Sequence, residues 1–256
     1  MTQYDSIGSQ YEVIKMIPQS RLEQFNFRRS VQPFLDVEGT TVIDYACGMD
    51  ISPAMVKGAV SRLSSTPFAD RARFLVGDGT KIESYVPAGM TGFDIATGAW
   101  FLNYAKDLEE LTGMFRSIAT NLTSDGTFVG ICLYATDDIS AQGEVCERPA
   151  LRKTGVKFQY EEELENGQGH RLHVIAYPPP RAPPHIKGVD FFCYHLKRSI
   201  YEEAARAGGL TGKLEWRKCI FLGEDWRWEM GLEDDEEGWR AIQDSPRLSI
   251  LVVRKT

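Results

Sequence analysis

The amino-acid sequence predicts an α/β fold built on one open, mostly parallel sheet. Three observations predict it: β-branched strand segments alternate with segments of helical spacing, small residues follow several strands, and 43% of the 256 residues are hydrophobic, enough for one core. We expect a single domain with a helical lid (1–37), a core (38–136), an insertion (137–198) and a C-terminal helix with closing strands (199–256).

The first elements follow from local patterns. Residues 4–35 are polar with scattered apolar anchors and are interrupted by Pro18, which predicts a helical lid. The segment 40–48 (TTVIDYACG) is typical of a buried parallel strand that runs into a ligand-binding turn. Ser52 suits the N-cap of a helix that extends to about Leu63.

Later segments continue the alternation and then break it. Strands are expected at 71–80, 93–105 and 127–135, with an amphipathic helix at 108–122. Two alternating stretches between Gly155 and Pro178 predict an antiparallel hairpin. The remaining elements are expected as a strand, a helix and two strands at 189–196, 199–209, 214–222 and 247–255. The acidic stretch 226–246 is typical of a solvated connection.

Composition excludes several classes of protein. Lys and Arg total 29 against 36 Asp and Glu, a net charge of -7 without a basic run, which argues against nucleic-acid binding. The five cysteines are widely spaced without a CxxC pair, which predicts reduced thiols in a cytoplasmic protein and no metal site. A polar N-terminus and the absence of a long apolar run predict neither secretion nor membrane spanning. The sequence leaves the oligomeric state open.

Acidic and small residues follow three of the predicted strands. They lie in Asp44–Gly48, in Met49–Ser52 and in Gly77–Gly79. Ligands of open α/β sheets bind at the carboxyl ends of the strands, where Asp50 can accept from ribose hydroxyls and Asp78 from an adenine amine. Each of these motifs alone occurs as often for structural reasons as for ligand binding. Their order along one chain is therefore the stronger evidence for a ligand site.

These motifs resemble those of a known family. VIDYACG, MDISPAMV, VGDGT and FDIATGAWFLNYA resemble successive motifs of class I S-adenosylmethionine-dependent methyltransferases, and YDSIG, SDGTFVG and DFFCYHLKRSIYEEAARAGG are similar to the toxoflavin-synthase-like small-molecule N-methyltransferase group. The resemblance covers nearly the whole chain. It implies a Rossmann-like fold with an antiparallel last strand, S-adenosylmethionine as cofactor, and a small-molecule acceptor in secondary metabolism, with nitrogen favoured.

The resemblance also implies a cofactor site made of lid and strand-end residues. Its members are Tyr11 and Arg28 on the lid, Ala46 and Gly48 at the methionine part, Asp50 at the ribose, Ile51, Met55, Asp78 and Gly79 at the adenine, and Ala99, Trp100 and Tyr104 at the sulfonium and acceptor. Aromatic faces favour a positively charged sulfur, which suits Trp100 and Tyr104. Packing in the core is the ordinary alternative for both.

Catalytic and substrate residues are less sharply indicated. A hydroxyl acceptor favours a nearby base, whereas an amine needs little help. The predicted insertion carries four candidate histidines, and His170 and His173 join Trp100 and Tyr104 as candidate catalytic residues. The other histidines are His185 and His195, and candidates for the substrate pocket are His185, Tyr194 and Trp228. Surface exposure or ordinary packing is the alternative for each.

One departure from the family pattern matters. The acid is expected about 20 residues after the glycine turn, but a single residue, Met49, separates Gly48 from Asp50. Adjacent parallel strands need a crossover of about a dozen residues. We therefore hypothesise that a segment between Gly48 and Met49 is missing from this sequence. The alternative is a true deletion, which would cripple cofactor binding.

Other functions stay open at this point. A dehydrogenase would need GxGxxG after the first strand, where the chain has ACG. A methyltransferase-like protein can also be a non-catalytic binding protein or a scaffold for another reaction, because fold alone does not decide function. Oxygen or sulfur remain possible acceptor atoms.

Overall fold

A five-stranded mixed sheet forms the centre of the protein. The structure is a computed structural model that describes residues 13–45, 48–67, 69–179 and 182–256. The strand order is β1 (Val42–Asp44), β4 (Phe93–Ala99), β5 (Leu122–Leu133), β10 (Leu248–Arg254) and β9 (Leu214–Lys218). β1, β4 and β5 are parallel, and β10 is antiparallel to both of its neighbours. This arrangement confirms the predicted α/β fold with an antiparallel last strand.

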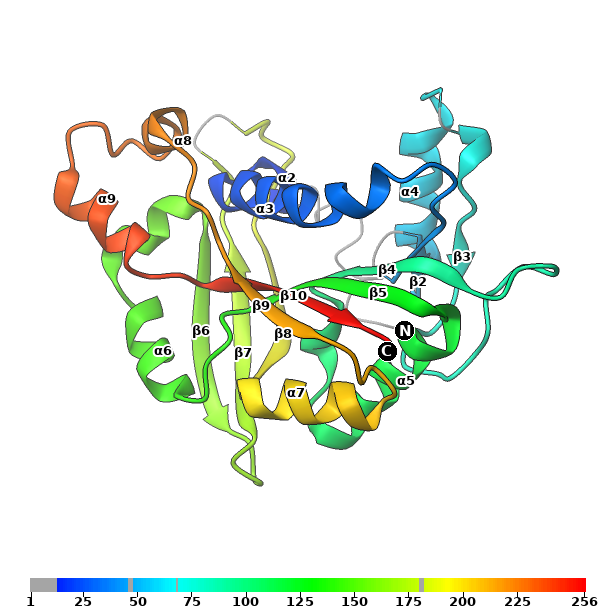
Figure 1. Cartoon of the computed structure of the whole chain (residues 1–256). Helices are drawn as coiled ribbons and strands as arrows, with labels where there is room; N and C mark the ends of the chain where they lie inside the picture. Colours follow the sequence, from blue (N-terminus) through cyan, green and yellow to red (C-terminus); the bar gives the residue numbers. More distant parts are fainter. Residues whose placement is uncertain (1–12, 46–47, 68, 180–181) are drawn as a thin grey trace.

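Helices cover both faces of this sheet (Figure 1). α5 (Leu108–Asn121) and α7 (Arg198–Ala207) pack together on one face, and α3 (Pro18–Leu35) lies on the other. Asp107 caps the start of α5, because its side chain accepts a hydrogen bond from the Glu110 amide. The apolar side of α5 is buried. The short α2 (Val13–Met16) precedes α3, which has Pro18 in its first turn.

The predicted hairpin is part of a second sheet. Its strands are β6 (Val156–Glu163), β7 (Gly169–Ala176) and β8 (Val189–Leu196), paired antiparallel in that order. Alternate side chains of β7 (Leu172, Val174 and Ala176) are buried in an apolar cluster with residues from α2 and β5. This sheet therefore forms a wall beside the ends of the central strands.

β2 (Met49–Asp50) and β3 (Leu75–Val76) form a separate parallel ribbon, with α4 (Pro53–Ser64) between them in the chain. Gly48 approaches the end of β1 closely, because a Cβ at Gly48 would lie 3.0 Å from the carbonyl oxygen of Asp44. β2 pairs with β3 and not with a strand of the main sheet. The hypothesis of a missing segment before Met49 stays a prediction.

The acidic C-terminal stretch is more structured than its composition indicates. It folds into α8 (Glu224–Glu229) and α9 (Glu236–Gln243), and its acids lie mainly at the surface. Trp226 is fully buried, donates to the Pro18 carbonyl and packs against Trp239. This stretch thus anchors the start of α3. The remaining elements are α6 (Ile139–Cys146), η2 (Ala69–Arg71), η3 (Phe101–Tyr104) and η4 (Pro149–Thr154).

Candidate functional site

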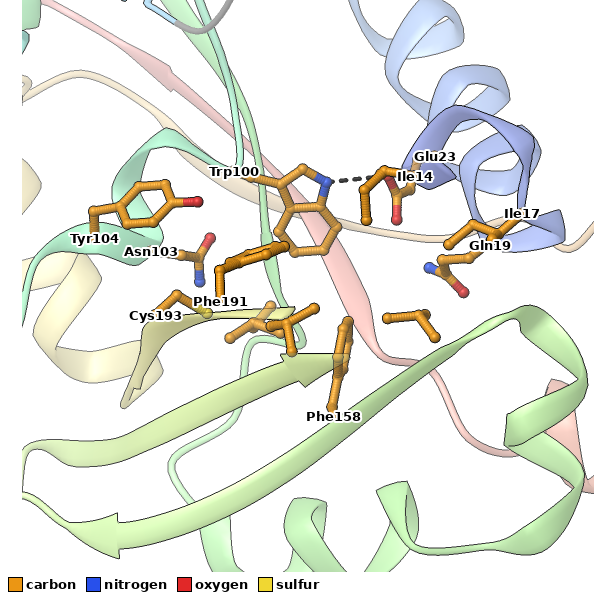
Figure 2. Close-up of a pocket in the computed structure, with 13 residues that line it drawn as sticks. Ile14, Ile17, Gln19, Glu23, Trp100, Asn103, Tyr104, Phe158, Phe191 and Cys193 are labelled. Carbon is orange, nitrogen blue, oxygen red and sulfur yellow. Dashed lines mark hydrogen bonds between the residues drawn. The ribbon is translucent and has the colours of Figure 1, made fainter. Parts of the chain in front are cut away.

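A cavity that is partly open to solvent lies where three parts of the fold meet. Its walls come from α2 and α3, from the carboxyl ends of β4 and β5, and from the inner face of the β6–β8 sheet (Figure 2). The lining is mostly apolar, with a few polar side chains, which is typical of a small-molecule site. The lining residues are Ile14, Ile17, Gln19, Glu23, Trp100, Asn103, Tyr104, Leu133, Val156, Phe158, Val174, Phe191 and Cys193.

The Trp100 side chain lies in the middle of the residues that line this cavity (Figure 2). Trp100 directly follows β4 and has a φ of 63°, the one left-handed backbone among the non-glycine residues that the structure describes. Such backbone strain gathers at functional sites, where the surrounding structure maintains it. The amide of Trp100 donates to the Ile131 carbonyl at 3.0 Å, and its indole Nε1 donates to Oε2 of Glu23 at 3.0 Å.

Glu23 places a carboxyl group against the apolar wall. Burial raises its pKa from 4.5 to about 7, while the Trp100 hydrogen bond, the Gln19 side chain and the Arg247 charge act in the opposite direction. Arg247 is itself buried and donates to Oε1 of Gln19 at 2.6 Å and to the Val156 carbonyl at 3.0 Å. Two polar pairs therefore lie near each other, Arg247 with Gln19 and Trp100 with Glu23.

Asn103 and Tyr104 contribute polar groups from η3. The Nδ2 of Asn103 donates to the Tyr194 carbonyl and to the Tyr201 hydroxyl, both at 3.3 Å. Because a backbone carbonyl only accepts, this contact fixes the orientation of the Asn103 amide. Its Oδ1 is buried without a hydrogen-bond partner in the described part of the chain. Burial, and next the Cys193 thiol, raise the pKa of Tyr104 well above its usual value, so its phenol stays protonated.

Among the described cofactor candidates, Trp100 and Tyr104 line this cavity, whereas Asp50 and Asp78 lie at or just after the ends of β2 and β3. Asp50 ends β2 and accepts from the Ser52 amide at 2.7 Å, and Asp78 comes two residues after β3 and accepts from the Thr80 amide and hydroxyl. These are local turn contacts that Asp side chains commonly make. Gly79 touches Phe101, because a Cβ there would lie 2.7 Å from the ring. The β3 turn therefore contacts η3.

Other predicted cofactor residues differ in exposure. Ile51 is 48% exposed, Met55 is half-buried, and Ala99 ends β4 directly before Trp100. Arg28 is exposed on α3. Tyr11 and Ala46 lie outside the described residues.

The candidate residues of the insertion do not line the cavity. His170 is half-buried beside Tyr160, and His173 pairs with Asp190 at 2.9 Å and stacks on Phe192. His185 is exposed, and Tyr194 lies on the opposite face of β8 from Phe191 and Cys193. Trp228 is 66% exposed on α8.

His195 is buried between two tyrosines. Its Nδ1 lies 2.7 Å from the Tyr160 hydroxyl and its Nε2 lies 2.9 Å from the Tyr134 carbonyl. Burial lowers the pKa of His195 to about 4. The ring is therefore neutral near pH 7 and holds β8 to neighbouring segments.

Sequence reasoning missed the polar residues of α3. Gln19, Glu23, Asn26 and Ser30 recur at spacings of four, three and four, so they share one face of the helix. Three of them, Gln19, Asn26 and Ser30, are buried. A polar stripe on the protein-facing side of a helix was the signal available in the sequence.

The described residues also limit other chemistry. No group of three or more His, Cys, Asp or Glu side chains among them can hold a metal ion. Four described cysteines, Cys132, Cys146, Cys193 and Cys219, are free thiols. Within the described ranges, no helix is both long and apolar enough to cross a membrane.

Comparison with known proteins shows which fold this is. No protein-family model matches the sequence, and no curated protein matches it. An S-adenosylmethionine-dependent methyltransferase from Clostridium acetobutylicum ATCC 824 is similar in structure, with a TM-score of 0.56, 13% identity and 99% of each chain covered. The glycopeptide N-methyltransferase MtfA, complexed with (S)-adenosyl-L-homocysteine, has a TM-score of 0.52 and 10% identity, covering 89% of this chain and 86% of its own.

A third similar structure is CalS10 with S-adenosylmethionine bound. It is an amino pentose methyltransferase from Micromonospora echinaspora involved in calicheamicin biosynthesis. Its TM-score is 0.50 at 13% identity, and the match covers 100% of this chain and 98% of CalS10. The chain therefore has the Rossmann-like fold of these methyltransferases.

Proposed function

We propose that this chain is an enzyme that transfers a methyl group from S-adenosylmethionine to a small-molecule acceptor, with nitrogen favoured. The observation that carries the proposal is the cavity that opens at the carboxyl ends of β4 and β5, the edge where ligands of open α/β sheets bind. The two similar methyltransferases named for an amino pentose and a glycopeptide nitrogen support the acceptor class. Membership of the toxoflavin-synthase-like group, secondary metabolism and a cytoplasmic location belong to the same proposal.

The acidic side chains at the strand ends suit the nucleoside part of the cofactor, because carboxylates accept hydrogen bonds from its hydroxyl and amine groups. Asp50 and Asp78 supply carboxylates for ribose hydroxyls and an adenine amine, and the exposed side chain of Ile51 supplies an apolar face. A single residue, Met49, separates Gly48 from Asp50, where the family pattern has a glycine turn and a helix for the methionine part. We therefore propose that the natural protein contains a further segment between Gly48 and Met49.

The cavity residues have distinct tasks in this proposal. S-adenosylmethionine, when bound, supplies a methyl group on a positively charged sulfur. Trp100 and Tyr104 present aromatic surface where the acceptor enters, and α3 with the β6–β8 sheet excludes water from it. Holding the acceptor lone pair in line is the main contribution that such an enzyme makes.

Two measurements test the proposal. Calorimetric titration of the natural gene product with S-adenosylmethionine is expected to show saturable binding, and a methyl-release assay against candidate amines is expected to show turnover. Binding without turnover on nitrogen, oxygen or sulfur acceptors would favour the second candidate, a methyltransferase-like scaffold. The absence of cofactor binding would refute the enzyme. The close approach of Gly48 to the carbonyl oxygen of Asp44 is the observation that favours this second candidate.

A further inference from the structure

We infer that Glu23 binds the acceptor of this site, and that the acceptor is an amine carried on an apolar, ring-containing body, from which Glu23 takes a proton. The inference rests on the proposed function and deepens it by naming the substrate class and a catalytic residue. It is argued from the walls of the cavity, from the placement of Glu23 and from a second polar group at Asn103.

The side chains that line the cavity favour a ligand with a large apolar part. Trp100, Phe158 and Phe191 contribute rings to the cavity, and Trp100 and Phe158 meet edge to face with centroids 6.5 Å apart. Aromatic faces attract cations and flat apolar groups. The lining offers few polar partners for hydroxyl groups, so an amine on an aromatic ring fits it better than an amine that carries several hydroxyl groups.

Glu23 is the acidic side chain of the cavity lining. Its Oε2 accepts the Trp100 indole proton at 3.0 Å, which aims the carboxyl group into the cavity beside the ring (Figure 2). A carboxylate against an apolar wall binds an ammonium group more strongly than one surrounded by water, because fewer water molecules compete for the pair.

Several titratable and charged groups face Glu23 from neighbouring elements. Arg247 and Cys219 act on it electrostatically, and Tyr104 and Cys193 lie in the same lining. Arg247 is bound to Gln19, Thr154 and the Val156 carbonyl, so its charge is held within the protein and is not offered to a ligand. Burial raises the pKa of Glu23 to about 7, which suits a group that takes a proton near neutral pH.

Asn103 supplies the second observation that points to a ligand. Its Oδ1 is buried and, within the described residues, accepts no hydrogen bond, while its Nδ2 is held by the Tyr194 carbonyl and the Tyr201 hydroxyl. An unpaired buried acceptor is costly unless a ligand donor completes it. Asn103 and Glu23 lie on opposite sides of Trp100 (Figure 2), so a ligand with donors at both ends satisfies both groups.

The proton and electron balance of the step is simple. The ammonium form gives one proton to the Glu23 carboxylate, and the amine nitrogen then uses its lone pair to form a bond to the methyl carbon. The sulfur keeps the electron pair of the carbon–sulfur bond that breaks. Glu23 later releases its proton to water.

Two matched probes test the site without cofactor. Tyramine has an amine at one end and a hydroxyl at the other, and 4-ethylphenol lacks the amine. By calorimetry at pH 7, we expect the wild-type protein to bind tyramine at least tenfold more tightly than 4-ethylphenol. Glu23→Gln should remove this preference, and Glu38→Gln, an exposed control with the same charge change, should keep it.

The outcomes separate the two proposals. Equal affinity of the wild-type protein for tyramine and 4-ethylphenol, or an undiminished amine preference in Glu23→Gln, would overturn the inference. If Glu23→Gln does not fold, Glu23→Asp decides: a loss of at least threefold in the preference supports the inference, and no loss overturns it. A parallel titration with S-adenosylmethionine reports on the enzyme proposal alone.

Discussion

The indole Nε1 of Trp100 donates a 3.0 Å hydrogen bond to Oε2 of Glu23, although 77 positions separate the two residues in the sequence. This contact joins the helix that covers the sheet to the end of a central strand. It also links Trp100, whose backbone is strained, to a carboxyl group whose pKa is raised to about 7. The first prediction follows from this coupling.

Trp100→Phe should raise the pKa of Glu23 above about 7, because the indole hydrogen bond stabilises the carboxylate. A shift of roughly one to two units is expected, since a hydrogen bond to a charged group contributes about 1.5–3 kcal/mol. NMR titration of the 13C-labelled Glu23 carboxyl measures it. An unchanged pKa in Trp100→Phe would contradict the coupling, and Trp228→Phe on the exposed face of α8 is the matched control.

Glu23→Gln should change how stability depends on pH. The pKa of Glu23 is raised in the folded protein, so its contribution is complete below about pH 4.5 and is lost as pH rises through about 7. The variant should lack this loss and exceed the wild-type free energy of unfolding at pH 8 by roughly 1–3 kcal/mol. Urea unfolding at pH 5, 6.5 and 8 measures the effect. Parallel curves for both proteins would show that Glu23 titrates normally.

The contribution of His195 to stability should change with pH in the opposite direction to that of Glu23. The pKa of His195 is lowered to about 4 in the folded protein from 6.5, so its contribution is present above about pH 6.5 and is lost as pH falls through 4. We expect a loss of at most roughly 3 kcal/mol over this range. His195→Asn should flatten the acid side of the stability profile, whereas His185→Asn, an exposed change, should leave it as in the wild type.

Asp50→Asn and Asp78→Asn should each weaken S-adenosylmethionine binding about tenfold or more, because each removes a charged acceptor. Asn keeps the side-chain oxygen that accepts from the turn amides of Ser52 and Thr80, so folding should be retained. Calorimetry measures the affinities. Asp70→Asn, exposed on η2, is the control, and equal affinities in all three variants would remove both acids from the cofactor site.

The intact mass of the protein from its natural source tests the missing segment. The sequence accounts for 28.8 kDa. A crossover of about a dozen residues or more between Gly48 and Met49 would add at least about 1.3 kDa. Peptide mapping across the junction gives the insert directly. A tryptic peptide in which Gly48 is followed by Met49 would establish a true deletion.

The sequence by itself determined which helices and strands form and their order along the chain. The helical spacing of α5, the strand pattern of β4 and the alternation in β6 and β7 are local signals, so the elements and their α/β class were predictable. The fold of the acidic stretch was not, because Trp226 becomes a core residue only when Pro18, 208 positions away, accepts its hydrogen bond.

The cavity was decided by tertiary structure alone. The sequence placed Trp100 and Tyr104 near the acceptor by resemblance, but it did not indicate Glu23, Gln19 or Asn103. Each of these owes its environment to distant partners: Glu23 to Trp100, Gln19 to Arg247 and Asn103 to Tyr201. Burial and hydrogen bonding between remote segments leave no local periodicity, and the pKa of a carboxyl group depends on what surrounds it after folding.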